Sequence, residues 1–291
     1  MRRRGPSGTP TTGTWKIGNR AEAIGTAPEA ADSWSSGSNY EAYIGRWSRL
    51  VAREFVPWLG VRGGARWLDV GCGTGALTEA VLAVGAPTAI VGVDPSPAFL
   101  DHAAATVTDP RVMLRHGDAL ALPVGDASFD AVVAGLVLNF LPDSPAALAE
   151  MRRATRPGGT IGGYVWDYTA GMQMLVSFWD AAVAEDPAIA REHEATRFAV
   201  NRPEPLQALF TGAGLQDVEV GDIVVPTGFP SFEEYWAPFL AGTGPAPAYT
   251  LSLSEPDRAK LREAVRARLP IEDDGSIHLT ARAWTVRGTV P

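Results

Sequence analysis

The sequence predicts an α/β fold of the Rossmann-like type, a doubly wound and mostly parallel sheet with helices on both faces and lid-like helical insertions. Short apolar runs alternate with helical patterns between residues 66 and 166, and closely spaced glycines follow the first apolar run. Such alternation requires a parallel sheet, whose ligands bind at the carboxyl ends of the strands. A functional site is therefore expected where these strands end.

The composition fits one large domain with no polyanionic partner. The chain has 291 residues, 46% of them hydrophobic, and its formal net charge of -8 disfavours nucleic acid as a partner. Cys72 is the only cysteine, which excludes an intramolecular disulfide and a zinc cluster, so we expect a cytoplasmic protein without a metal site. No stretch is long and apolar enough to span a bilayer. We expect residues 1–38, rich in Gly, Pro, Ser and Thr, to form a disordered tail, and residues 39–291 to form the domain.

The first expected elements are a helix, a strand and a glycine loop. Residues 40–59 have helical periodicity, and the apolar run that begins at Arg66 passes through Asp69 into the loop. Gly71, Gly73 and Gly75 lack Cβ, so the backbone can turn tightly and a ligand can lie directly against it. Thr74 can cap the helix that follows.

The loop alone fits two ligand classes, because it also satisfies the dinucleotide pattern of spaced glycines. Asp69 discriminates between them, since its carboxylate would repel a pyrophosphate and attract a cation. The second strand, residues 89–93, ends at Asp94, which can accept hydrogen bonds from ribose hydroxyls in either class. The third strand, residues 112–115, leads to Asp118, which can accept a hydrogen bond from the exocyclic amine of an adenine.

The remaining pattern continues the alternation. We expect strands at residues 129–134 and 160–166, a helix at 144–155 that breaks at Pro157-Gly158-Gly159, and later helices at 173–183, 203–213, 231–240 and 255–269, with strands at 218–225 and 279–286. The carboxyl ends of these strands should bring together Asp94, Asp118, Gly135 and the residues after Trp166.

A cation, a ribose and an adenine together describe S-adenosylmethionine, and the chain resembles the class I S-adenosylmethionine-dependent methyltransferases. The resemblance rests on ordered motifs: residues 67–75, Val93-Asp94-Pro95-Ser96, Gly117-Asp118-Ala119 with Leu122-Pro123, residues 128–133, and residues 156–160. It covers about residues 40–165 and is most similar to the small-molecule branch that includes ubiquinone and menaquinone methyltransferases. It implies that S-adenosyl-L-methionine binds at Tyr40, Arg46, Asp69, Gly71, Cys72, Gly73, Thr74, Gly75, Asp94, Pro95, Asp118, Ala119 and Gly135.

The resemblance implies methyl transfer to O, N or C of a small, partly apolar acceptor, achieved mainly by proximity and alignment. It also implies a cofactor-binding core at about residues 40–166, acceptor-binding and lid segments at about 167–275, and a last strand at about 279–286. Many relatives carry histidine soon after the fourth strand, whereas this chain has Asn139, which could orient the acceptor. Asp167 is the other catalytic candidate, either as a general base or as a cap of the following segment. Trp166, Tyr168 and Trp236 could line an acceptor pocket or complete the core.

Two alternatives remain open at this point. A non-catalytic S-adenosylmethionine-binding sensor or partner module would keep the fold without turnover. An NAD-dependent oxidoreductase would share the glycine loop and Asp94, but it does not account for Asp69 or for Gly117-Asp118-Ala119.

Overall fold

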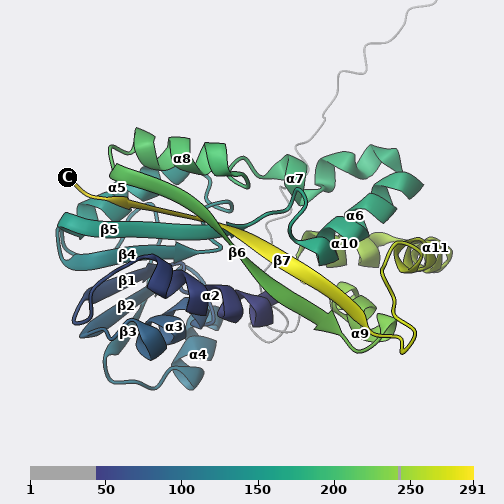
Figure 1. Cartoon of the computed structure of the whole chain (residues 1–291), viewed down its shortest axis with the longest axis horizontal. Coiled ribbons are helices and arrows are strands. Elements are labelled where there is room, and N and C mark those ends of the chain that lie inside the picture. The colour runs from purple at the N-terminus through teal and green to yellow at the C-terminus, as the bar shows by residue number, and fades with distance from the viewer. Residues whose placement is uncertain (1–43, 242–243) are drawn as a thin grey trace, which may run out of the picture. The chain divides into compact units, whose positions relative to one another are not determined.

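The computed structural model of the protein describes residues 44–241 and 244–291, which belong to one compact unit, Trp34–Pro291. A seven-stranded sheet with the order β3-β2-β1-β4-β5-β7-β6 forms its centre (Figure 1). The strands are β1 Arg66–Val70, β2 Ala89–Asp94, β3 Val112–His116, β4 Phe129–Gly135, β5 Thr155–Trp166, β6 Gln216–Phe229 and β7 Ile277–Thr289. The first five pair in parallel, and β7 runs antiparallel between β5 and β6. This sheet confirms the doubly wound, mostly parallel fold expected from the sequence.

Two hydrophobic layers flank the sheet because successive strand residues point to opposite faces. Trp67 faces the layer that contains α2 (Arg46–Trp58) and α3 (Ala76–Val84), whereas Leu68 faces the layer that contains α5 (Ser144–Ala154) and α8 (Pro203–Gly212). Helix α4 (Pro97–Thr106) packs along β2 and β3. Polar side chains occupy the N-cap positions of α4 and α5. Ser96 accepts a hydrogen bond from the backbone of Phe99, and Asp143 accepts one from the backbone of Ala146.

A group of helices lies beyond the carboxyl ends of the parallel strands, where β6 and β7 extend past the rest of the sheet (Figure 1). We call this group the cap; it consists of α6 Gln173–Glu185, α9 Phe232–Trp236, η3 Ala237–Leu240, α10 Pro245–Ser252 and α11 Glu255–Arg266. Its interior is aromatic, and the rings of Phe178 and Phe239 stack with centroids 4.4 Å apart. The short helices η2 Pro187–Glu192 and α7 Glu194–Arg197 follow α6.

Several element boundaries differ from the sequence-based expectation. Strand β5 begins at Thr155, not after the Pro-Gly-Gly break, because Thr155 already pairs with Phe129 before the register shifts. The break is a local irregularity in the strand, where Gly158 adopts a φ of +74°. Strands β6 and β7 are longer than expected, since they pair with each other over almost their whole lengths. Helices α4, α7 and α10 and the 3₁₀ segment η2 were not predicted.

In the described part of the chain, no helix has both the length and the apolar character needed to cross a membrane.

Candidate functional site

The glycine loop connects the carboxyl end of β1 to α3 and is tied to the neighbouring strand. The backbone N–H groups of Gly71 and Cys72 both donate to the carbonyl oxygen of Val93, at 2.7 and 3.1 Å. Gly71, Gly73 and Gly75 have φ values of +69°, +53° and +91°, which glycine adopts more readily than other residues. The loop backbone is thus held against the end of β2.

The three glycines have different reasons to lack a side chain. A Cβ on Gly71 would lie 2.4 Å from Val137, and a Cβ on Gly75 would lie 2.8 Å from Val107. A Cβ on Gly73 would meet its nearest neighbours only at 4.0 Å. Gly71 and Gly75 therefore permit close packing of the protein itself, whereas a Cβ on Gly73 would make only ordinary van der Waals contacts.

Helix α3 begins differently from the expectation for Thr74. Gly75, in the left-handed conformation, is the N-cap residue, and Thr74 lies buried one position before it. The expected Thr74 cap was wrong because the loop glycine, with its positive φ, makes the transition into the helix.

Asp69 presents a buried carboxylate beside this loop. Its side chain is 1% exposed, and its Oδ2 accepts a hydrogen bond of 2.7 Å from the hydroxyl of Thr78 on α3. Its Oδ1 is buried and has no hydrogen-bond partner within the described ranges. Burial raises the pKa of Asp69 to about 7, and the charge of Asp94 adds to this rise. A cationic ligand would offset both effects.

Asp94, at the end of β2, holds two loops together. Its Oδ2 accepts a hydrogen bond of 2.9 Å from the backbone of Gly73, and its Oδ1 accepts one of 2.8 Å from Ser96. Burial raises the pKa of Asp94, although these two hydrogen bonds act in the opposite direction. Each carboxylate oxygen has a second lone pair, so Asp94 can still accept a hydrogen bond from a ribose.

The end of β3 lies beside the end of β2. The backbone of Gly117 donates to the carbonyl oxygen of Asp94 at 3.1 Å, and the His116 ring lies 3.1 Å from the carbonyl oxygen of Pro95. Asp118 is exposed, its Oδ1 accepts a hydrogen bond of 2.9 Å from Leu120, and Ala119 is buried. These contacts gather the predicted ribose-binding and adenine-binding residues at one edge of the sheet.

Cys72 packs inside the loop and does not present a reactive thiol. A Cβ on Gly92 would lie 2.9 Å from the sulfur, so the thiol fills the space above this strand glycine. Burial raises the pKa of the Cys72 thiol, and the charges of Asp69 and Asp94 add to the rise. The thiol therefore stays protonated and serves as a small packing group.

The loop after β4 approaches the glycine loop through Val137. Gly135 leaves room for Tyr164, whose hydroxyl would lie 2.6 Å from a Cβ at that position. Leu136 adopts a φ of +60°, which is unfavourable for a residue with a side chain. Asn139, in the same loop, has a buried amide whose nitrogen and oxygen both lack a hydrogen-bond partner in the described part of the chain.

Asp167, which follows β5, has both carboxylate oxygens in hydrogen bonds. Its Oδ2 accepts hydrogen bonds from the guanidinium of Arg282 on β7, at 2.6 and 2.9 Å, and its Oδ1 accepts from Thr169 and from the backbone of Ala170. Burial alone would raise the pKa of Asp167, but the hydrogen bonds from Thr169 and Arg282 bring it below its usual value. Of the two roles considered for Asp167, this geometry favours the cap over the general base.

The aromatic candidates for an acceptor pocket lie inside the core. Trp166 is 1% exposed, and Tyr168 packs against Phe198 with ring centroids 5.2 Å apart. Trp236 belongs to the cap, where its ring contacts Phe232, Phe178 and Phe239. These contacts favour core packing for Trp166 and Trp236. Tyr168 contacts Phe198, which in turn contacts the loop after β4.

Two further candidates precede β1 in the sequence. Tyr40 lies outside the described residues. Arg46 opens α2, and its guanidinium lies over the rings of Trp47 and Phe229, 4.7 and 5.2 Å from their centroids. Partial burial lowers the pKa of Arg46, although nearby Glu234 counteracts this.

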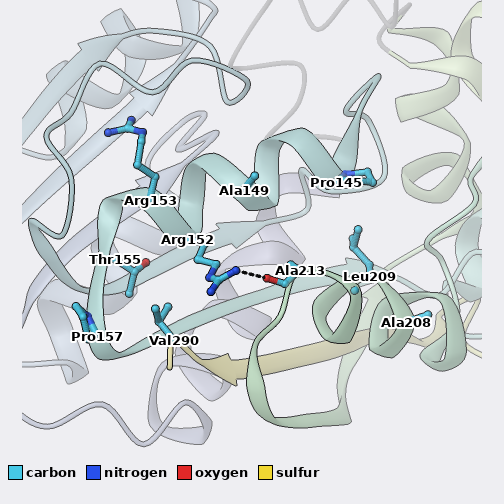
Figure 2. A pocket seen from close by; sticks show the side chains of 11 residues that line it. Pro145, Ala149, Arg152, Arg153, Thr155, Pro157, Ala208, Leu209, Ala213 and Val290 are labelled. Carbon is cyan, nitrogen blue, oxygen red and sulfur yellow. Dashed lines mark hydrogen bonds between the residues drawn. The ribbon is translucent and has the colours of Figure 1, made fainter.

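A hollow of about 790 Å³ lies elsewhere, between the end of α5, the start of β5, α8 and Val290 (Figure 2). Arg152 borders it and donates a hydrogen bond of 3.1 Å to the carbonyl oxygen of Ala213. Because the hollow borders the amino end of β5, it is separate from the carboxyl edge where open α/β sheets bind ligands. None of the predicted site residues lines it.

The sequence analysis did not identify the roles of three residues that contact this site. Thr78 lies in the first turn of α3 and contacts Asp69 on β1, and no local pattern in the sequence indicates this contact. Arg282 and Val137 contact Asp167 and Gly71 from distant parts of the chain, and no local pattern indicates these contacts.

In comparison with known sequences, the segment that contains the glycine loop and the strands around it matches a family model. Residues 68–162 match the family model described as a methyltransferase domain. The chain is 41% identical over 117 residues to a demethylmenaquinone methyltransferase of Staphylococcus aureus strain MRSA252, a match that covers 40% of this chain and 47% of that protein. The chain thus spans about half the length of the curated relatives that it matches.

Comparison with solved structures extends over most of the chain. A putative methyltransferase from Bacillus halodurans C-125 superposes with a TM-score of 0.56 and 15% identity, covering 82% of this chain and 98% of that one. Phosphoethanolamine N-methyltransferase 2 of Haemonchus contortus, solved with phosphomonomethylethanolamine and S-adenosylhomocysteine, gives a TM-score of 0.54 and 16% identity over 88% of this chain and 57% of that one. At these identities the structures establish a shared fold, and together with the family match they confirm the resemblance.

Proposed function

We propose that this chain, whose residues 68–162 form a methyltransferase domain, uses S-adenosyl-L-methionine to methylate O, N or C of a small, partly apolar acceptor. The observation that carries the proposal is the buried Oδ1 of Asp69, which has no hydrogen-bond partner within the described part of the chain and lies on the strand that leads into the glycine loop. A buried carboxylate oxygen without a partner is costly, and a cationic ligand is the partner that best offsets the cost.

The same residues fit the parts of that cofactor. Asp69 would attract its positive charge, the bare backbone at Gly73 would border it, Asp94 would accept hydrogen bonds from its ribose, and Asp118 with Ala119 would border its adenine. When bound, S-adenosylmethionine supplies a methyl carbon that is already activated by the sulfonium. Asp69 disfavours NAD at the same loop, because its carboxylate would repel the pyrophosphate.

The protein contributes alignment and exclusion of water rather than proton transfer. Asp167 is held by Arg282 with a lowered pKa, and Asn139 carries an amide that does not take up a proton near neutral pH. Correct placement of two reactants can by itself supply roughly 7–11 kcal/mol of the barrier reduction. An acceptor that loses its proton readily would need no base from the protein.

The nature of the acceptor and the cellular location belong to the same proposal. The relative from Staphylococcus aureus is named for demethylmenaquinone, and the aromatic cap above the carboxyl edge is compatible with a partly apolar acceptor of that general kind. The lone cysteine fits a cytoplasmic protein, in which disulfides are rare.

The first experiment is thermal unfolding with S-adenosylhomocysteine and with NAD. A ligand that binds the folded state at a hundred times its dissociation constant stabilises it by about 2.7 kcal/mol, so S-adenosylhomocysteine should raise the unfolding midpoint and NAD should not. Asp94→Ala should reduce this rise, whereas Asp109→Ala should not, because Asp109 pairs with Arg111 on the surface.

Methyl transfer from labelled S-adenosylmethionine to a panel of small acceptors then tests catalysis. Transfer supports the enzyme, and binding without transfer to any acceptor would favour a sensor or partner module. Equal stabilisation by NAD, or no response to S-adenosylhomocysteine, would contradict the cofactor assignment.

A further inference from the structure

The amide of Asn139 is a buried polar group whose hydrogen bonds are not made within the described chain. Its Nδ2 and Oδ1 are both buried, and neither has a partner among the described residues. An amide shielded from water loses its hydrogen bonds to solvent, and the folded protein gains nothing in return. An unsatisfied buried polar group in a native structure has a specific reason, and a functional role is one such reason.

The other asparagine in the described residues makes the opposite use of its amide. Asn201 is 2% exposed, and its Nδ2 donates to the carbonyl oxygens of Glu194 and Ala195 at 3.4 and 3.2 Å. Burial of an asparagine in this fold is therefore compatible with internal hydrogen bonds. Asn139 is half-buried as a residue, but its amide atoms are buried and lack such hydrogen bonds across the described ranges.

The position of Asn139 connects the glycine loop to an aromatic group. Two residues before it, Val137 lies so close to Gly71 that a side chain there could not fit. One residue after it, Phe140 packs edge to face against Phe198, with centroids 4.9 Å apart, and Phe198 contacts Tyr168. The backbone between Gly135 and Asn139 is also strained, because Leu136 adopts a positive φ. Strain of this kind is concentrated at binding and catalytic sites.

The chemistry of an amide defines the ligand group that it can hold. Nδ2 donates and Oδ1 accepts, and the side chain carries no charge. A carboxylate or phosphate could only accept, and an ammonium could only donate, so either would leave half of the amide unpaired. A neutral hydroxyl or carboxamide satisfies both atoms.

We infer that Asn139 is a positioning residue that binds the acceptor through a neutral hydroxyl or carboxamide, next to the apolar surface of Phe140 and Phe198. The inference rests on the proposed function, because it assigns the acceptor to the same edge of the sheet. Asn139 fixes the orientation of the acceptor and takes no proton from it.

Phenol and toluene provide a matched pair of probes, since they have similar size and only phenol has the hydroxyl. Each is titrated into protein saturated with S-adenosylhomocysteine, and binding is followed by the backbone amide signals of ¹⁵N-labelled protein, which the native protein and its variants share. One hydrogen-bonded group is worth about a tenfold difference in affinity, so phenol should bind about ten times more tightly than toluene. Asn139→Leu should remove this preference, and Asn201→Leu should keep it.

Stability provides the second readout. Asn139→Leu removes two buried polar atoms that have no partner among the described residues, so it should not lower the unfolding midpoint. Asn201→Leu removes hydrogen bonds that the folded protein forms, so it should lower the midpoint. Equal affinity of the native protein for the two probes, no binding of either probe, or a phenol preference that survives in Asn139→Leu would overturn the inference. Stabilisation by S-adenosylhomocysteine in Asn139→Leu shows separately whether the cofactor site is intact.

Discussion

At the scale of single residues, the decisive features are polar groups that are buried before any ligand is present. Asp69 has one carboxylate oxygen paired with Thr78 and the other unpaired within the described residues, in a position that is 1% exposed. In a ligand-free protein, this arrangement favours the protonated carboxyl, and a cation favours the ionised one. The residue therefore links stability, pH and ligand binding.

The ligand-free protein should lose stability as the pH rises through the range in which Asp69 ionises. Its pKa is raised from 3.8 to about 7, so the folded state keeps a proton that the unfolded state releases. The stabilisation is complete below the unfolded pKa and disappears as the pH passes about 7. Urea unfolding should be measured between pH 5 and pH 8, a range that spans the Asp69 pKa of about 7. The native protein should show this loss of stability, and Asp69→Asn should show a flatter profile. Identical pH profiles for the two proteins would contradict the prediction.

Replacement of Gly73 by alanine can distinguish the loss of space for a ligand from the cost of backbone strain. Gly73 and Gly64 both have positive φ, and at neither position would an added Cβ come closer than 4.0 Å to a neighbouring atom. Alanine at either position should cost about 1–2 kcal/mol of stability. Only Gly73→Ala should abolish stabilisation by S-adenosylhomocysteine, measured as the shift in unfolding midpoint. An unchanged shift in Gly73→Ala would show that the ligand does not use this space.

At the scale of elements, the Asp167–Arg282 pair joins the end of β5 to β7. The two strands are paired up to Trp166 and Ala283, and the ion pair continues the connection into the segment that leads to α6. The backbone contributes as well, since Asp167 donates to the carbonyl oxygen of Arg282 at 2.9 Å. The carboxylate thus positions the beginning of the cap relative to the sheet.

Asp167→Asn should therefore affect stability more than the pH dependence of turnover. Loss of one partner from a buried pair costs about 3–5 kcal/mol, and we expect roughly 1–3 kcal/mol here because the Arg282 side chain is 33% exposed. A double-mutant cycle with Arg282→Gln, measured by urea unfolding, should give a favourable coupling energy. If the variant keeps full stability but loses one limb of the pH profile of kcat, the general base role is correct instead.

At the scale of the whole described unit, β6 and β7 connect the sheet to the cap. They pair with each other from Gln216 and Thr289 to Phe229 and Ile277, while α6 packs against β7 and α9 against β6 (Figure 1). The cap helices are therefore anchored on the two strands that complete the sheet.

Cap and sheet should unfold in one transition. Tryptophan fluorescence reports on the cap through Trp179 and Trp236 and on the sheet through Trp67 and Trp166, and far-ultraviolet circular dichroism reports on all helices and strands. Phe178→Ala, a fully buried ring in the cap, should lower both midpoints together, by about 3–5 kcal/mol of stability. A separate, earlier fluorescence transition would show that the cap is an independent unit.

The sequence alone determined the order of strands and helices, the glycine loop and the carboxylates Asp69, Asp94 and Asp118, because each depends on local backbone preferences and on the rule that ligands bind where parallel strands end. Only the tertiary structure decided which of these groups remain unpaired. Arg282 reaches Asp167 across 115 positions, Val137 closes the space at Gly71, and the amide of Asn139 is buried without a partner in the described part of the chain. These contacts depend on packing between distant segments, and no local periodicity encodes them.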